Sequence, residues 1–206
     1  MLHVTHCSMP NDASREADVD FAPFVALLRR WNRTLNLISP ADEARIEARH
    51  LADSLQLAPL IPSTVDRAID LGSGAGFPGL VLAAATGIRF DLIESDQRKA
   101  VFLREAARTL GVPVQVHAQR IETVHIPPAR LVTARALAPL PRLLALAAPL
   151  LAPDGVALFL KGGAVESELT AANREWHMRV ERFPSRTSAT GVILRITELA
   201  RVPPAG

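Results

Sequence analysis

Apolar residues in the first third of the chain recur at intervals of three and four, which is the spacing of an amphipathic helix. The residues that follow this spacing most clearly are Phe24, Leu27, Leu28, Trp31 and Leu35. They predict a helix over residues 21–37, with Trp31 on its apolar side. A second stretch of this kind predicts a helix over residues 42–57, which Pro59 and Pro62 end. We expect the two helices to form a cap on the rest of the chain.

From residue 68 onward, short apolar runs alternate with helical stretches. The strand candidates are AIDL (68–71), FDLIES (90–95), VQVHAQ (114–119), RLVTARAL (130–137) and VALFLKG (156–162). The helical candidates between them are GLVLAAATG (79–87), RKAVFLREAARTLG (98–111) and RLLALAAPLLA (142–152). This alternation is typical of a parallel sheet flanked by helices. Two further apolar runs, 178–185 and 191–199, predict an antiparallel pair that completes a mostly parallel, seven-stranded sheet.

The length of 206 residues fits a single α/β domain. We expect residues 1–18 to be a disordered tail and residues 19–206 to be the domain, with the helical cap in 19–62 and a Rossmann-like core in 63–206. The longest apolar segments are interrupted by proline and too short to span a bilayer, so no membrane partner is expected. The chain opens without a secretory leader pattern and has a single cysteine, which favours the cytoplasm.

Charge and metal-ligating residues narrow the function only slightly. The formal net charge of +2 permits a polyanionic partner without demanding one. His3, His6 and Cys7 are three candidate metal ligands in a polar tail that offers no fourth, so no metal site is expected.

The stretch LGSGAGFPG, residues 71–79, has the GxGxxG spacing of a loop that approaches a ligand closely. Both a nicotinamide dinucleotide and S-adenosylmethionine are candidates, and Glu94 at the next strand end could take the ribose hydroxyls of either. Asp70 separates them, because a carboxylate there would repel a pyrophosphate but can pair, directly or through water, with the ammonium of a methionine moiety. The sequence therefore favours S-adenosylmethionine, with Gly72 and Gly74 in the loop that holds it.

Two later strand ends supply further candidates. Backbone N–H groups near Ile121 and Glu122 lie where an adenine ring would rest, although Glu122 is equally explained as a solvated acid at a helix start. Arg135 follows the apolar run of the fourth strand. It could hold the surroundings of the donor, a substrate phosphate or a base, or it could be a salt-bridged structural arginine. These alternatives remain open on the residues alone.

Several motifs together identify a family. The chain resembles the bacterial small-subunit rRNA guanine-N7 methyltransferases of the RsmG type, also called glucose-inhibited division protein B. The motifs that carry the resemblance are Trp31-Asn32, Asn36-Leu37, Arg49-His50, Asp53-Ser54-Leu55, the run from Asp70 to Gly79, Lys99, Phe102-Leu103, Thr133-Ala134-Arg135-Ala136 and Lys161-Gly162. They cover about residues 31–162. The chain departs from the family pattern at Ala189-Thr190-Gly191, where the family usually has an arginine before the final strand.

The resemblance implies a Rossmann-like class I methyltransferase that uses S-adenosylmethionine to methylate N7 of a guanine in the decoding-region loop of 16S rRNA. The donor contacts that it implies are Gly72, Phe77, Ile121, Glu122 and Arg135, with Asp70 and Glu94 in support. Arg135 is the expected catalytic residue. Because of their charge, Arg49, Lys99 and Lys161 are the expected contacts to substrate phosphates. We expect a monomer that acts on the small ribosomal subunit.

The chemistry of this reaction agrees with what the chain lacks. Guanine N7 already presents a lone pair, so methyl transfer to it needs near-attack geometry and no general base. Neither a plausible thiolate nucleophile nor an Asn/Asp-Pro-Pro-aromatic loop is present. His50 is interpreted as a structural histidine, and each exposed arginine by itself as part of a solvated helix face.

Three other functions are weighed against this one. An NAD-dependent oxidoreductase is disfavoured by Asp70 and by the lack of any tyrosine. A methyltransferase for another RNA or for a small molecule, and a non-catalytic RNA-binding protein with the same fold, remain as alternatives.

Overall fold

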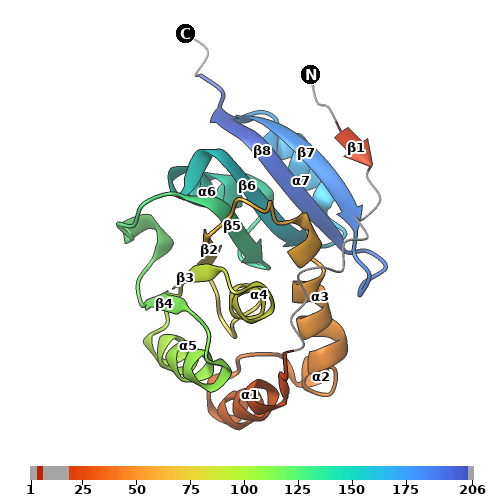
Figure 1. Cartoon of the computed structure of the whole chain (residues 1–206). Helices are drawn as coiled ribbons and strands as arrows, with labels where there is room; N and C mark the ends of the chain where they lie inside the picture. Colours follow the sequence, from red (N-terminus) through yellow and green to blue (C-terminus); the bar gives the residue numbers. More distant parts are fainter. Residues whose placement is uncertain (1–3, 7–18, 204–206) are drawn as a thin grey trace.

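The computed structural model describes residues 4–6 and 19–203. Its centre is one sheet with the strand order β1-β7-β8-β6-β5-β2-β3-β4 (Figure 1). The strands are β1 (Val4–His6), β2 (Arg67–Leu71), β3 (Arg89–Ile93), β4 (Val114–His117), β5 (Ala129–Arg135), β6 (Leu151–Lys161), β7 (Trp176–Pro184) and β8 (Val192–Arg201). Strands β2 to β6 pair in parallel, and β8 runs antiparallel to both β6 and β7. The prediction of a mostly parallel sheet with an antiparallel C-terminal pair is confirmed.

The sheet has one strand more than the sequence predicted. β1 pairs in parallel with β7 at the edge of the sheet and lies within the stretch expected to be a disordered tail. Residues 1–3 and 7–18 of that predicted tail lie outside the described residues.

Helices cover both faces of the sheet (Figure 1). They are α1 (Ala22–Leu35), α2 (Pro40–Glu43), α3 (Ala52–Leu55), α4 (Gly79–Thr86), α5 (Gln97–Leu110), α6 (Leu140–Ala147) and α7 (Val165–Ala172), with a π-helix η1 (Ile46–Leu51) and single 3-10 turns at Ala58–Leu60, Ile121–Thr123 and Ala148–Leu150. One apolar cluster joins α1, η1, α4 and α5 to the sheet, and a second joins α6 and α7 to its other face. The sheet is therefore buried on both sides, as a parallel sheet requires.

The first helix of the cap agrees with its prediction, and the second does not. α1 places Phe24 against Phe77 and Phe102 in the core, while Trp31 packs edge-on against Phe102 and donates a hydrogen bond to Glu105. The single helix predicted over residues 42–57 is wrong, because the chain forms α2, η1 and α3 in succession there. The wider π turn lets Ile46, His50 and Leu51 all face inward.

Helix α7 was missed by the sequence analysis. Its buried residues, Val165, Leu169 and Ala172, keep helical spacing, and Glu166 and Glu168 lie in its first turn, where negative charge is favourable. The helix has only eight residues and follows two glycines. The signal was therefore present but short.

The loop that ends β2 depends on close backbone packing at Gly79. A Cβ atom at this position would lie 2.6 Å from the Cβ of Asp70 and 2.7 Å from a methyl carbon of Leu92. We predict that Gly79→Ala lowers the free energy of unfolding by about 1–3 kcal/mol, because neither neighbour is the free end of a long side chain.

Urea denaturation measures this change, and Gly162→Ala is the matched control. A Cβ atom at Gly162 would meet nothing within 4 Å, so its free energy of unfolding should stay within about 0.5 kcal/mol of the parent value. Equal stability of the two variants would contradict the packing argument.

Candidate cofactor and substrate site

Two adjoining cavities open at the carboxyl ends of the parallel strands, where ligands bind in folds of this architecture. The larger has a volume of about 450 Å³ and lies between the cap, β5, β6 and the loop before β8. The smaller has a volume of about 290 Å³ and lies beside the ends of β3 and β4. Gly72 and Gly74 line both cavities, so the glycine loop is the wall that the two cavities share.

The smaller cavity brings together most of the residues predicted to hold the donor. Those that line it are Gly72, Gly74, Glu94, Ile121 and Glu122. The carboxylate of Glu94 accepts hydrogen bonds from the backbone N–H groups of Gly74 (2.9 Å) and Asp96 (2.8 Å), which fix it at the end of β3. Lys99, predicted to bind substrate, lines this cavity and not the larger one.

Asp70 lies beneath the glycine loop and lines neither cavity. It has no exposed surface. The hydroxyl of Thr133 on the neighbouring strand β5 donates a hydrogen bond to one carboxylate oxygen (2.7 Å). Burial raises the pKa of Asp70 to about 6, against the hydrogen bonds that favour the charged form. A supporting role for Asp70 in donor binding stays a prediction. The contact that the structure shows is the hydrogen bond from Thr133, which joins β2 to β5.

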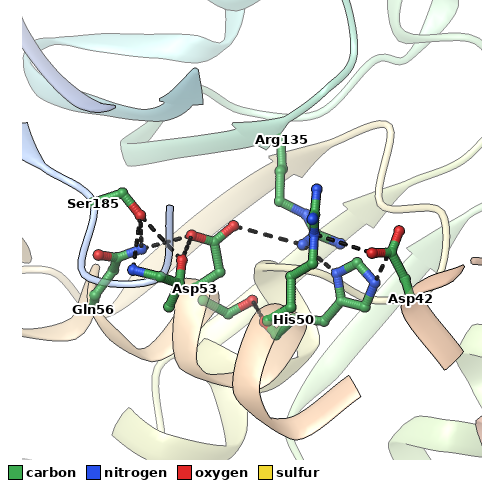
Figure 2. Close-up of polar contacts among 9 residues, drawn as sticks. Asp42, His50, Asp53, Gln56, Arg135 and Ser185 are labelled. Carbon is green, nitrogen blue, oxygen red and sulfur yellow. Dashed lines mark hydrogen bonds and ion pairs between the residues drawn. The ribbon is translucent and has the colours of Figure 1, made fainter. Parts of the chain in front are cut away.

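Arg135 lines the larger cavity beside His50, as Figure 2 shows, and also contacts the ring of Phe77. One guanidinium nitrogen lies 2.7 Å from His50 Nδ1, and the guanidinium carbon lies 4.9 Å from the centre of the Phe77 ring. The His50 ring stacks on Phe77 at 5.0 Å. Phe77 is itself buried, with Phe24 packed against it. The predicted donor residue Phe77 is therefore a rigid platform for Arg135.

His50 is a neutral hydrogen-bond acceptor in this arrangement. Burial, together with the adjacent charge of Arg135, lowers the pKa of His50 to about 4. Since Nδ1 accepts from Arg135, the ring proton resides on Nε2, which is buried and lies 3.9 Å from Asp42 Oδ2. His50 was interpreted from the sequence as structural, but it contacts the predicted catalytic residue in the wall of the cavity.

Acidic and polar groups that the sequence analysis did not single out complete this wall. Asp53 lies 3.7 Å from the guanidinium of Arg135 and accepts a hydrogen bond from Thr187 in the loop before β8. Burial lowers the pKa of Arg135, and the nearby Asp53 opposes that change. Asp53 belongs to one of the motifs that carried the family resemblance, but its type and spacing gave no sign of this contact.

The other predicted substrate contacts, Arg49 and Lys161, also line the larger cavity. Arg49 is half exposed and pairs with Asp42 at 3.1 Å. Lys161 is nearly buried, lies 2.6 Å from Glu168 and donates to the backbone carbonyl of Ala138. Arg49 is thus accessible to a polyanion, whereas Lys161 is held in the wall by an acid of α7.

The sheet order and the helices on both faces define the class of fold as Rossmann-like, which is the fold of several solved methyltransferases. A methyltransferase described as TehB-like and SAM-dependent, from Corynebacterium glutamicum, superimposes with a TM-score of 0.56 at 17% identity and covers 86% of this chain and 99% of its own. A ribosomal protein L11 methylase from Lactobacillus delbrueckii subsp. bulgaricus superimposes with a TM-score of 0.57 at 16% identity, covering 70% and 77% of the two chains.

Sequence comparison then gives the family. A family model described as rRNA small subunit methyltransferase G matches residues 18–191. The protein of that name from Granulibacter bethesdensis is 56% identical over 92% of this chain and 89% of its own, and the one from Gluconobacter oxydans is 52% identical over 92% and 97%. The chain belongs to the rRNA small subunit methyltransferase G family, as the sequence motifs predicted.

The described part of the chain contains neither a cluster of metal-ligating side chains nor a helix that could span a membrane. Within residues 4–6 and 19–203, no group of three or more His, Cys, Asp or Glu side chains is placed to hold a metal ion. In the same part of the chain, no helix is long and apolar enough to cross a membrane.

The neutral state of His50 gives a prediction for stability. Its pKa is about 4 in the folded protein and 6.5 ordinarily, so the unfolded chain binds more protons between these values. The contribution of His50 to stability should therefore fall by up to about 3 kcal/mol as the pH is lowered from 6.5 to about 4. We predict that His50→Gln removes this part of the pH dependence.

The measurement is the difference in unfolding free energy between the parent and His50→Gln at a series of pH values. A difference is needed because the pKa of Asp70 is raised from 3.8 to about 6 and this shift acts on stability with the opposite sign. The contribution of Asp70 to the stability of the protein is lost as the pH rises through that range. The exposed His177 supplies the control variant, His177→Gln. A difference that does not vary with pH would contradict the buried neutral state of His50.

Proposed function

We propose that this protein transfers the methyl group of S-adenosylmethionine to N7 of a guanine in 16S rRNA, within the small ribosomal subunit. The observation that carries the proposal is the pair of cavities that meet at Gly72 and Gly74. A donor and an acceptor bound on opposite sides of a thin glycine loop can bring their reacting atoms together. Family membership supports the choice of rRNA as the acceptor.

The residues of the smaller cavity fit the adenosine part of this donor. Glu94 is placed to accept hydrogen bonds from ribose hydroxyls, and the Ile121–Thr123 turn offers an apolar side chain and backbone groups to an adenine. Gly72 has a positive φ, and a Cβ atom there would lie 2.6 Å from a methyl carbon of Leu137, so a larger residue does not suit this position. When bound, the donor supplies an electrophilic methyl group on a sulfonium.

The larger cavity fits a reaction that needs orientation and no proton transfer. Guanine N7 attacks through its own lone pair, and no proton leaves the base. His50 would be a poor base, because its basic nitrogen is engaged by Arg135 and its pKa is depressed. Arg135, fixed by His50 and Phe77, offers a rigid planar donor to the nucleotide, which is the form of catalysis that positioning supplies.

The same features weigh against the alternatives. An NAD-dependent oxidoreductase agrees neither with the family nor with an acidic residue beneath the loop. The half-exposed Arg49 and the neighbouring arginines of the cap favour a polyanionic acceptor over a small molecule. Ribosomal RNA as the acceptor places the reaction in the cytoplasm. A monomeric state stays a prediction.

The test is transfer of a labelled methyl group from S-adenosylmethionine to small ribosomal subunits. We expect label only on subunits from a strain that lacks the modification, at guanine N7, with fully modified subunits as the control. Donor binding without transfer to any subunit would favour a non-catalytic RNA-binding protein. Transfer to a different RNA or a different atom would contradict the proposed substrate.

Arg135→Lys tests the positioning role in the same assay. Lysine keeps the charge but lacks the planar guanidinium that bonds His50 and contacts the Phe77 ring at the same time. We therefore predict a loss of at least about tenfold in kcat with little change in donor affinity. Arg130, an exposed arginine paired with Asp154, gives the matched control Arg130→Lys. Full activity of Arg135→Lys would return Arg135 to a purely structural role.

A further inference from the structure

The carboxylate of Asp53 uses its two oxygens unequally. Oδ1 accepts hydrogen bonds from Gln56 Nε2 (2.6 Å) and from the hydroxyl of Thr187 (2.8 Å). Oδ2 lies 3.7 Å from the guanidinium of Arg135, which is an ion-pair distance but longer than a hydrogen bond. Asp53 lines the larger cavity, and because a carboxylate oxygen has two lone pairs, Oδ2 can accept a further hydrogen bond beside Arg135.

The orientation of this carboxylate is fixed from both sides (Figure 2). Gln56, which holds Oδ1, also accepts a hydrogen bond from the backbone N–H of Arg186 (2.9 Å) and donates to Ser185 (3.3 Å). Helix α3 and the loop before β8 are thus joined by side-chain contacts around Asp53. A carboxylate held in this way discriminates better than a mobile one, because its geometry is set before the ligand arrives.

We propose, on the basis of the function proposed above, that Asp53 Oδ2 binds the Watson–Crick edge of the target guanine. That edge presents two donors, N1–H and the 2-amino group, and an ionised carboxylate is an acceptor only. Adenine presents an unprotonated N1 and has no 2-amino group, so Asp53 would repel it. N7 lies across the base on the imidazole ring, and a contact at the Watson–Crick edge leaves it free to react.

The charge of Asp53 also suits the reaction itself. A bond forms between N7 and the methyl carbon as the bond between sulfur and that carbon breaks, and sulfur keeps the electron pair. The positive charge consequently moves from the sulfonium to the base, and no proton moves. A carboxylate bound to the guanine stabilises the partly positive base of the transition state more than it stabilises the neutral base before reaction. This difference accelerates methyl transfer.

The other carboxylate in the cavity wall does not have this freedom. Asp42 accepts a hydrogen bond from the hydroxyl of Ser39 at one oxygen (2.7 Å) and pairs with Arg49 at the other (3.1 Å). Both of its oxygens are therefore engaged within the cap. Asp53 is the better candidate for base recognition.

The test combines a variant with a changed base, using small subunits reconstituted with guanosine or inosine at the target position. Inosine keeps N7 and N1–H but lacks the 2-amino group. With the parent protein, we expect inosine to lower kcat/KM about tenfold or more, since a charged hydrogen bond is lost. Asp53→Asn should lower transfer to guanosine by at least about tenfold and reduce the inosine penalty to about twofold or less.

Asparagine keeps an acceptor oxygen for Gln56 and Thr187, so the variant should fold, which thermal unfolding verifies. Asp154→Asn, an exposed acid outside both cavities, is the matched control and should retain the full inosine penalty. An equal penalty in the parent and Asp53→Asn overturns the proposal, as does a parent protein that methylates inosine as fast as guanosine. If the parent transfers nothing to guanosine subunits, the proposed function fails and this inference fails with it.

Discussion

The contact between Arg135 and His50 connects the sheet to the helical cap at the point where they enclose the larger cavity. Arg135 ends β5 in the sheet, and His50 lies in the π-helix of the cap. A buried guanidinium is costly unless its donors are satisfied, and a neutral imidazole nitrogen satisfies one of them without adding a charge. Protonation of His50 would place two cations 2.7 Å apart. Burial lowers the pKa of His50 most, and the charge of Arg135 at this contact lowers it further.

Asp70 and Asp53, the two acids discussed above, differ in how deeply they are buried, and this difference decides which of them a ligand can reach. Asp70 is fully enclosed and serves the loop from below. Asp53 remains partly exposed, with one oxygen held by Gln56 and Thr187 and the other 3.7 Å from the guanidinium of Arg135. An enclosed acid is suited to internal contacts, whereas a partly exposed acid beside an arginine is accessible to a ligand.

The parts of this site that could be predicted from sequence are those fixed by local chain chemistry. The glycine run, the acid at the end of β3 and the arginine at the end of β5 follow directly from strand periodicity, because parallel strands bring their carboxyl ends to one edge. The division of the cap into α2, η1 and α3 depends on which side chains the core can accommodate. The partnership of Asp53 with Thr187 joins residues 134 positions apart, and no local pattern encodes such a contact.

The surroundings of the three basic residues predicted to contact substrate could not be predicted from their charge either. Arg49, Lys99 and Lys161 were grouped by charge, but the fold distributes them: Arg49 lies at an accessible edge of the larger cavity, Lys99 lines the smaller one and Lys161 pairs with an acid of α7. That acid, Glu168, also accepts a hydrogen bond from the backbone N–H of Leu140 at the start of α6. Lys161 therefore belongs to a contact that joins β6, α6 and α7, and its charge is already balanced. In the function proposed here, the exposed arginines of the cap attract the polyanion, and the enclosed groups beneath them recognise a single base.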